Sequence, residues 1–144
     1  MSSLPDEAQH RFVALLNKKV ETGRLMNALG HMTAGLVGGS GNIEQFCFLQ
    51  YHDADNGTHP NISHFPFIVL RADNSNQIRT LRNTLLEKGI PFTDFTSTMT
   101  VGTSEEQQNT TSGTAELGLE YWGICTFGDT DTLRDLTKKF QLFR

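Results

Sequence analysis

Three polar side chains early in the chain have the types and the spacing that chemistry requires. Arg24, Asn27 and His31 follow one another at steps of three and four residues, so a helix would place them on one face. An imidazole can act as a general base near neutral pH, and a guanidinium beside an amide can hold a polar ligand. With Lys18, which follows an apolar run, they predict a polar pocket at the end of the first strand. A His31 packed among its apolar neighbours is the alternative.

A polar segment between residues 52 and 64 offers oxygen and nitrogen atoms that could hold a metal ion. Its possible ligands are His52, Asp53, Asp55, His59 and His64. The run from Asp53 to Gly57 is similar to the opening of a calcium loop, but its glycine comes one position early and His64 stands where that loop has glutamate. Asp, Asn and Gly are also typical turn residues. The sequence therefore favours an ordinary hairpin loop, and we expect no metal.

A covalent nucleophile is not indicated. No Gly-x-Ser-x-Gly elbow occurs in the sequence. The two cysteines, Cys47 and Cys125, lie inside the apolar runs FCFL and GICTF, without the basic neighbour that favours a thiolate. We expect both to be buried free thiols.

Length and composition limit the class of protein. The chain has 144 residues, of which 37% are hydrophobic and 19% charged, which predicts a single folded domain over residues 1–144. The formal net charge of −4 disfavours nucleic acid as a partner, because phosphate binding relies on clustered cations. No apolar run reaches the ~20 residues of a membrane helix, and the N-terminus does not resemble a signal peptide. We expect a cytoplasmic protein with no membrane contact.

Apolar periodicity predicts the elements that position these side chains. The strands are expected at residues 11–16, 46–51, 65–70, 90–95 and 121–127, with a short edge strand in the tail 140–144. A first helix, capped by Thr22 or Gly23, is expected to continue to Leu36 and end in glycines 38–41. A second should follow Asp73 or Asn74 and end at Gly89. A last one, capped within 128–131, should carry Leu133, Leu136 and Phe140 on one face.

Two further segments complete the predicted fold. Strands 46–51 and 65–70 should form a hairpin joined by the polar loop between them. Residues 97–118 are rich in polar side chains, although Thr103 and Glu106 have the spacing of a capping box and could start a short helix. Strands alternating with helices indicate an α/β fold with a mixed, mainly four-stranded sheet and helices on both faces.

Several segments resemble a known group of proteins. RFVALLNKKVETGRLMNALGHMTAGL resembles the first strand and helix of the type II peptidyl-tRNA hydrolases, with Gly23, Arg24 and His31 at matching places. YWGICTFGDTDTLRDLTKKFQLF is similar to that family's closing strand, helix and strand. HFPFIVLRADNSNQIRTLR, FTSTMTVGT and the ending KKFQLF resemble more closely a bacterial branch of that superfamily, the domain of unknown function 2000 family. The resemblance implies a peptidyl-tRNA hydrolase II-like fold, a homodimer, and ligand-binding positions at Lys18, Thr22, Arg24, Asn27, Ser97 and Met99.

Two departures from the hydrolases shape the functional prediction. Thr22 stands where they have a lysine, and Ser97 aligns with their acidic residue. Cleavage of the ester between peptide and tRNA needs cations against phosphate and a group that activates water. We therefore predict a protein-binding or regulatory module without a cofactor, acting on a protein partner. The alternative is a hydrolase of peptidyl-tRNA or a related acyl ester, in which His31, Arg24 and Asn27 would be catalytic.

Each hypothesis has a structural signature. An enzyme should present His31 in a concave pocket with Arg24 and Asn27, and an acid such as Asp94 or Glu105 beside Arg24 would strengthen it. A binding module should leave these side chains packed or flat and carry an exposed apolar patch elsewhere.

Overall fold

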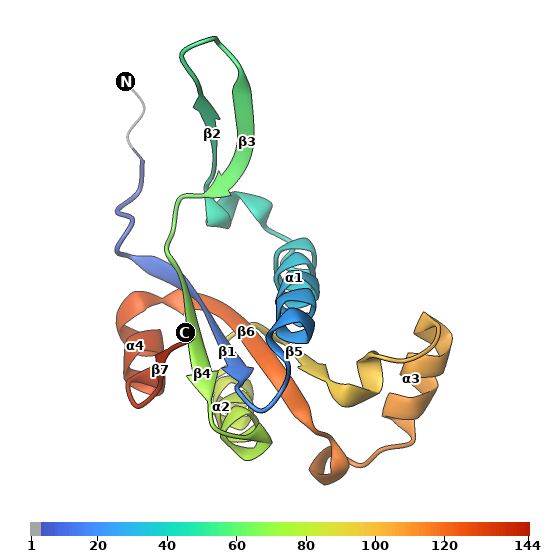
Figure 1. Cartoon of the computed structure of the whole chain (residues 1–144). Coiled ribbons are helices and arrows are strands. Elements are labelled where there is room, and N and C mark those ends of the chain that lie inside the picture. Colours follow the sequence, from blue (N-terminus) through green and yellow to red (C-terminus); the bar gives the residue numbers. More distant parts are fainter. Residues whose placement is uncertain (1–3) are drawn as a thin grey trace.

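Strands and helices alternate along most of the chain, and the computed structural model describes residues 4–144 (Figure 1). The main sheet consists of β1 (His10–Asn17), β4 (Phe67–Ala72), β5 (Phe92–Thr96), β6 (Tyr121–Asp129) and β7 (Gln141–Leu142). A separate pair contains β2 (Phe48–His52) and β3 (Thr58–Ser63). The α-helices are α1 (Thr22–Gly38), α2 (Ser75–Lys88), α3 (Ser104–Ser112) and α4 (Thr130–Thr137). Short 3-10 helices are η1 (Ile43–Phe46), η2 (Ser97–Met99) and η3 (Glu116–Gly118).

Strand β1 lies at the centre of a sheet with the order β5-β6-β1-β4-β7. It pairs parallel with β4 and antiparallel with β6. Its side chains alternate between two apolar cores, as a strand covered on both faces requires. Phe12, Ala14 and Leu16 pack with α1, whereas Val13 and Leu15 pack with α2 and α4. The predicted mixed α/β architecture with helices on both faces is therefore confirmed.

Helix α1 carries the candidate site on the face opposite the core. Its buried side chains recur at helical spacing: Leu25, Ala28, Met32 and Leu36. The N–H of Leu25 already bonds to the carbonyl of Glu21 at 3.1 Å, so Glu21 is the N-cap and the predicted cap at Thr22 or Gly23 is wrong. The end is as predicted, because the N–H of Gly39 bonds to the carbonyl of Gly35 at 2.9 Å.

The other long helices begin where local sequence predicts. The side chain of Asn74 accepts from the N–H of Gln77 at 3.0 Å at the start of α2, and Gly89 ends that helix with φ of 68°, a conformation that glycine adopts freely. At the start of α4, Asp129 accepts from the N–H of Thr132 at 3.0 Å. These caps confirm both predicted starts and the predicted end of α2. The expectation that the last helix carries Phe140 is wrong, because α4 ends at Thr137.

The predicted hairpin between residues 46–51 and 65–70 is wrong. Strand β2 pairs instead with β3, which lies inside the segment expected to be a loop, and β4 pairs with β1 in the main sheet. The turn between β2 and β3 closes on Asp53, whose Oδ1 accepts from the N–H groups of Asp55 and Gly57, both at 2.9 Å. Figure 1 shows this pair, the β2–β3 arm, protruding from the rest of the molecule.

The number of strands also differs from the prediction. The expected sheet was mainly four-stranded, whereas the main sheet has five strands because the two residues of β7 pair with β4. Residues 97–118 contain η2, α3 and η3, and the capping box at Thr103 and Glu106 is confirmed. Cys47 is half-buried and Cys125 is buried, and both are free thiols. Within residues 4–144, no helix combines the length and the apolar character needed to cross a bilayer.

Candidate ligand-binding cleft

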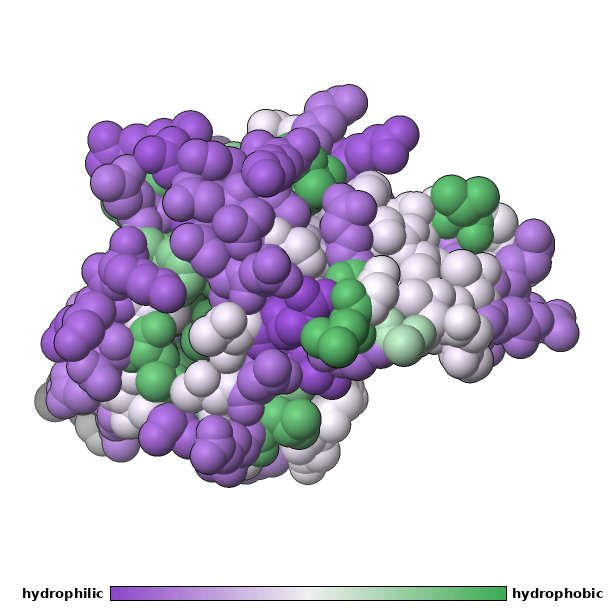
Figure 2. Space-filling model, turned by 90° about the horizontal axis from the view of Figure 1, so that it is seen from below, coloured by the Kyte–Doolittle hydropathy of each residue, from purple (hydrophilic) through white to green (hydrophobic). Residues whose placement is uncertain are grey.

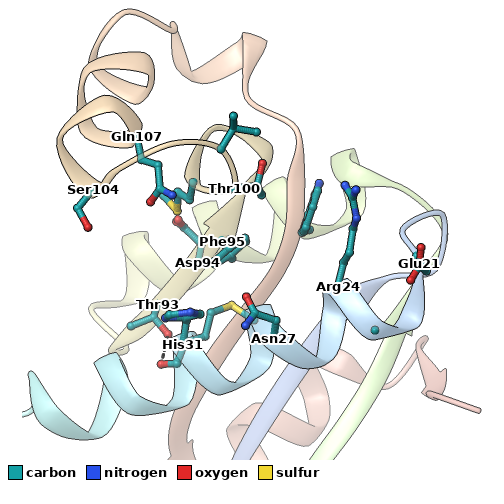
Figure 3. Close-up of a pocket in the computed structure, with 15 residues that line it drawn as sticks. Glu21, Arg24, Asn27, His31, Thr93, Asp94, Phe95, Thr100, Ser104 and Gln107 are labelled. Carbon is teal, nitrogen blue, oxygen red and sulfur yellow. Dashed lines mark hydrogen bonds between the residues drawn. The ribbon is translucent and has the colours of Figure 1, made fainter.

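A cleft of about 880 Å³ lies between the exposed face of α1 and the segment formed by η2 and α3 (Figure 3). Strands β5 and β6 contribute its floor. A volume of this size falls in the range of ligand sites in proteins, roughly 300–1,000 Å³. The cleft is thus large enough to hold a ligand of several residues or a small molecule.

Three polar side chains of α1 form one wall. Arg24, Asn27 and His31 all line the cleft and are all exposed. Among residues 4–144, none of these three side chains takes part in a hydrogen bond or an ion pair with another protein group. Arg24 and His31 instead lie beside aromatic rings. The His31 and Phe95 rings have centroids 6.2 Å apart. Donors and acceptors on this wall are therefore free to meet a ligand.

The floor is aromatic. Phe95 on β5 and Trp122 on β6 have ring centroids 5.8 Å apart, and the guanidinium carbon of Arg24 lies 5.8 Å from the centre of the Trp122 ring. This distance permits a cation–π attraction. The hydroxyl of Thr93 donates to the carbonyl of Met32 at 2.8 Å, which fixes α1 against β5 at the base of the cleft.

A network of hydroxyl groups fixes the opposite wall. The Oγ1 of Thr98 lies 2.7 Å from that of Thr96 and 2.8 Å from that of Thr111, so η2 is tied both to β5 and to α3. This connection places Met99 and Val101 beside the cleft. The lining on this side is completed by Thr100, Ser104 and Gln107.

A second network anchors the start of β6 next to the floor. The carboxylate of Glu116 accepts from Arg79 Nε at 2.8 Å and from the Tyr121 hydroxyl at 2.9 Å. The Arg79 guanidinium lowers the pKa of Glu116, while burial, followed by the bond to Glu116, raises the pKa of Tyr121 to about 12. The neighbouring Trp122 is thereby held in a defined place.

The comparison with known proteins identifies the family. A model described as "Protein of unknown function (DUF2000)" matches residues 10–144. The chain belongs to the DUF2000 family. It is also similar in structure to a protein of unknown function from Agrobacterium tumefaciens, with a TM-score of 0.80 and 17% identity over 94% of this chain and 98% of that one. At this identity the likeness shows a shared fold. No curated protein matches the chain.

The DUF2000 fold brings together only part of the predicted site. Arg24, Asn27, His31 and Met99 line the cleft. Lys18 lies outside it, with Nζ 2.9 Å from Asp73 Oδ1, and this bond lowers the pKa of Asp73. Thr22 and Ser97 do not line it either. The role of the four gathered residues in binding stays a prediction.

Other lining residues of the DUF2000 cleft were not predicted from the sequence. Glu21 lies three residues before Arg24, so the helical spacing that found Arg24 could have found it as well. Trp122, Phe95 and Gln107 come from distant parts of the chain, and no local pattern connects them with α1. The aromatic floor therefore becomes visible only in the folded structure.

Neither of the acids that would favour an enzyme, Asp94 and Glu105, lies unpaired in this cleft. Asp94 borders it, but its Oδ2 lies 3.0 Å from Arg82 Nε on α2. Glu105 is exposed on α3 and is not part of the lining. Glu21 is the carboxylate on the α1 wall, and no ion pair within residues 4–144 joins it to His31. The arrangement offers hydrogen bonding, a cation and apolar contact, but no assembled acid–base pair.

The possible metal ligands of the β2–β3 arm do not gather. His59 Nε2 lies 2.8 Å from Asp53 Oδ2, whereas His64 Nε2 contacts the carbonyl of Pro5 at 2.7 Å. Within the described part of the chain, no three His, Cys, Asp or Glu side chains come close enough to share an ion. The Asp53–His59 contact and the turn bonds lower the pKa of Asp53, and they stabilise the turn.

Proposed function

We propose that this chain is a binding module that receives a short segment of a partner protein in the cleft between α1 and η2–α3. The observation that supports this most is that Arg24, Asn27 and His31, which have no polar partner among residues 4–144, present their polar groups above an aromatic floor. Polar groups that fix orientation, combined with apolar surface that provides contact area, are the usual composition of a binding site.

The chemistry of the lining suits a peptide better than a compact ion. Amides at Asn27 and Gln107 contain both donors and acceptors, as a peptide main chain does. Met99 and Trp122 supply a flexible and a flat apolar surface, and methionine adapts readily to side chains of different shape. The 78% exposed Val101 at the rim can be covered by a bound segment.

A second candidate function is hydrolysis of peptidyl-tRNA or a related acyl ester. It is favoured by one specific observation, the exposed His31 inside a concave cleft with Arg24 and Asn27. Against it, Arg82 engages Asp94, and Thr22 and Ser97 replace the charged residues of the hydrolases. The concave cleft with an exposed His31 is the arrangement expected of an enzyme. On the face seen in Figure 2, apolar side chains are scattered among hydrophilic ones, so the broad apolar patch expected of a binding module is not seen on that face, and the binding proposal rests on the lining of the cleft.

Selection from a displayed library of random peptides tests the binding proposal. We expect the wild type to enrich related peptides, and the Arg24→Ala/Asn27→Ala double variant to bind them at least about tenfold more weakly, which is about 1.4 kcal/mol. Lys138→Ala removes an exposed cation directly after α4 and should bind like the wild type. Absence of any enriched peptide, or equal binding by the double variant, would contradict the proposal.

Three accompanying proposals remain. From the family resemblance, we propose that the chain has a fold shared with the type II peptidyl-tRNA hydrolases and forms a homodimer; from the sequence expectations, we propose that it works in the cytoplasm. Light scattering of the purified protein measures its mass in solution, and a mass of one chain at all concentrations would contradict the dimer.

A further inference from the structure

The outer edge of β5 is open. In the sheet order β5 comes at one end, and it pairs with β6 on one side. Within residues 4–144, no strand pairs with its other side. An edge of this kind presents main-chain N–H and C=O groups that another extended chain can bind.

Two hydrogen bonds show which main-chain groups of β5 face β6. The carbonyl of Pro91 accepts from the Thr126 hydroxyl at 2.7 Å, and the N–H of Ser97 donates to the carbonyl of Glu120 at 3.0 Å. Both partners belong to β6 or directly precede it. Main-chain groups alternate in direction along a strand, so the odd-numbered residues of this segment face β6.

The even-numbered residues face outward. The N–H of Thr96 confirms this direction, because it meets the sulfur of Met99 at 3.5 Å rather than β6. Phe92 and Asp94 lie two and four residues earlier, so each directs one N–H and one C=O to the open edge. Outside the sheet pairing, the main-chain hydrogen bonds of residues 4–144 do not use either residue. Two donors and two acceptors are therefore available.

This edge borders the cleft. Thr93, Asp94 and Phe95 all belong to its lining, and Figure 3 shows β5 between His31 on α1 and Gln107 on α3. The bond from Arg82 to the Asp94 carboxylate at 3.0 Å compensates the charge at this position. A strand laid along β5 would thus pass between the two walls.

We propose that the partner segment binds as an extended strand on the open edge of β5, with an acidic side chain directed at Arg24. This rests on the proposed function and specifies its ligand. Donors and acceptors at strand spacing are matched by another extended main chain, whereas a small anion would use Arg24 alone. Arg24 has no ion pair within the described residues and stacks on Trp122, so a carboxylate complements its charge.

N-methylation of the selected peptides tests the main-chain pairing. A strand uses every second amide against its neighbour, so methylation at alternate positions should weaken binding about tenfold or more, and methylation between them should have little effect. Hydrogen exchange of the Asp94 amide should slow when the peptide binds. The Thr93 amide, which faces β6, is the matched control and should keep its rate.

A charge exchange tests the acidic contact. Arg24→Glu should bind an acidic selected peptide at least about tenfold more weakly, and a peptide with lysine in place of the acid should recover part of that loss. If the library yields no peptide, the proposed function fails together with this inference. If peptides bind in the cleft without the alternating response or the Asp94 protection, strand addition alone is overturned. If hydrogen exchange of the Asp94 amide also slows in the free protein as the protein concentration rises, a second copy of the chain occupies the edge. In that case the proposed strand addition by a partner is overturned as well.

Discussion

The guanidinium carbon of Arg24 lies 5.8 Å from the centre of the Trp122 ring, across the floor of the cleft. Trp122 is the single tryptophan of the sequence, so its fluorescence reports on the candidate site alone. Arg24 belongs to the exposed face of α1, and the indole is 8% exposed. The guanidinium thus screens the ring from water without being part of the core.

Arg24→Ala should shift the emission of Trp122 to longer wavelength, because removal of the guanidinium admits water to the ring. The free energy of unfolding should change by no more than about 0.5 kcal/mol, as expected for an exposed position. Emission spectra and urea denaturation measure both quantities. Lys138→Ala is the control and should leave the spectrum unchanged. An identical shift in that variant would mean that the shift does not come from the contact between Arg24 and Trp122.

Gly30→Ala should stabilise the protein by about 1 kcal/mol. Gly30 lies inside α1, and a Cβ atom built on it has no neighbour within 4 Å. Alanine restricts the unfolded chain and favours helix by roughly that amount relative to glycine. Urea denaturation provides the measurement, and a variant less stable than the wild type would show that this face of α1 is not open.

Gly123→Ala should have the opposite effect. Its Cβ would lie 2.8 Å from both Leu16 Cδ2 and Met32 Cε, and these two side chains are 3% and 2% exposed. Leu16 is enclosed by the core, and the Met32 methyl would have to leave its place beside the cleft, so we expect the overpacking to cost about 1–3 kcal/mol. Equal stability of the variant and the wild type in urea would mean that Met32 repacks into the cleft.

The hydrogen bond between Tyr121 and Glu116 at the start of β6 should make the stability of the protein depend on pH. Its pKa is raised from 10.0 to about 12 by burial and by the bond to Glu116, so the folded state holds the proton more tightly than the unfolded state. This contribution is complete below pH 10 and is lost as the pH rises toward 12. The unfolding free energy should therefore fall between these pH values in the wild type, with a shallower decline in Tyr121→Phe. In Tyr51→Phe, which retains Tyr121 as its one tyrosine, phenolate absorbance should appear with a midpoint near pH 12 if the protein remains folded.

Local chemistry made much of the fold predictable. Asn74, Gly89 and Asp129 each define a helix boundary through a bond to a residue only a few positions away. The β2–β3 arm was missed because its second strand, THPNIS, contains proline and asparagine and lacks the apolar alternation of a half-buried strand. Its pairing depends on the turn at Asp53 rather than on burial.

The candidate site was predictable on one wall only. Arg24, Asn27 and His31 share a helix face, and periodicity finds such a face directly. Trp122 and Gln107 reach the same cleft through the sheet and through α3, which sequence spacing does not encode. Lys18 was misplaced for a similar reason, because its partner Asp73 follows a different strand and draws it away from the cleft.

The remaining prediction separates binding from catalysis. We expect no release of peptide from peptidyl-tRNA by the wild type above the rate without protein, because His31 lacks a carboxylate partner and Arg82 engages Asp94 within the described structure. Without a carboxylate to orient its ring, the His31 imidazole would be a poorly positioned base for activating water. His31→Ala, purified in the same way, reveals any contaminating hydrolase, and His52→Ala in the β2–β3 arm is the matched control. Clear turnover by the wild type and by His52→Ala that disappears in His31→Ala would overturn the binding-module proposal and make the chain a hydrolase.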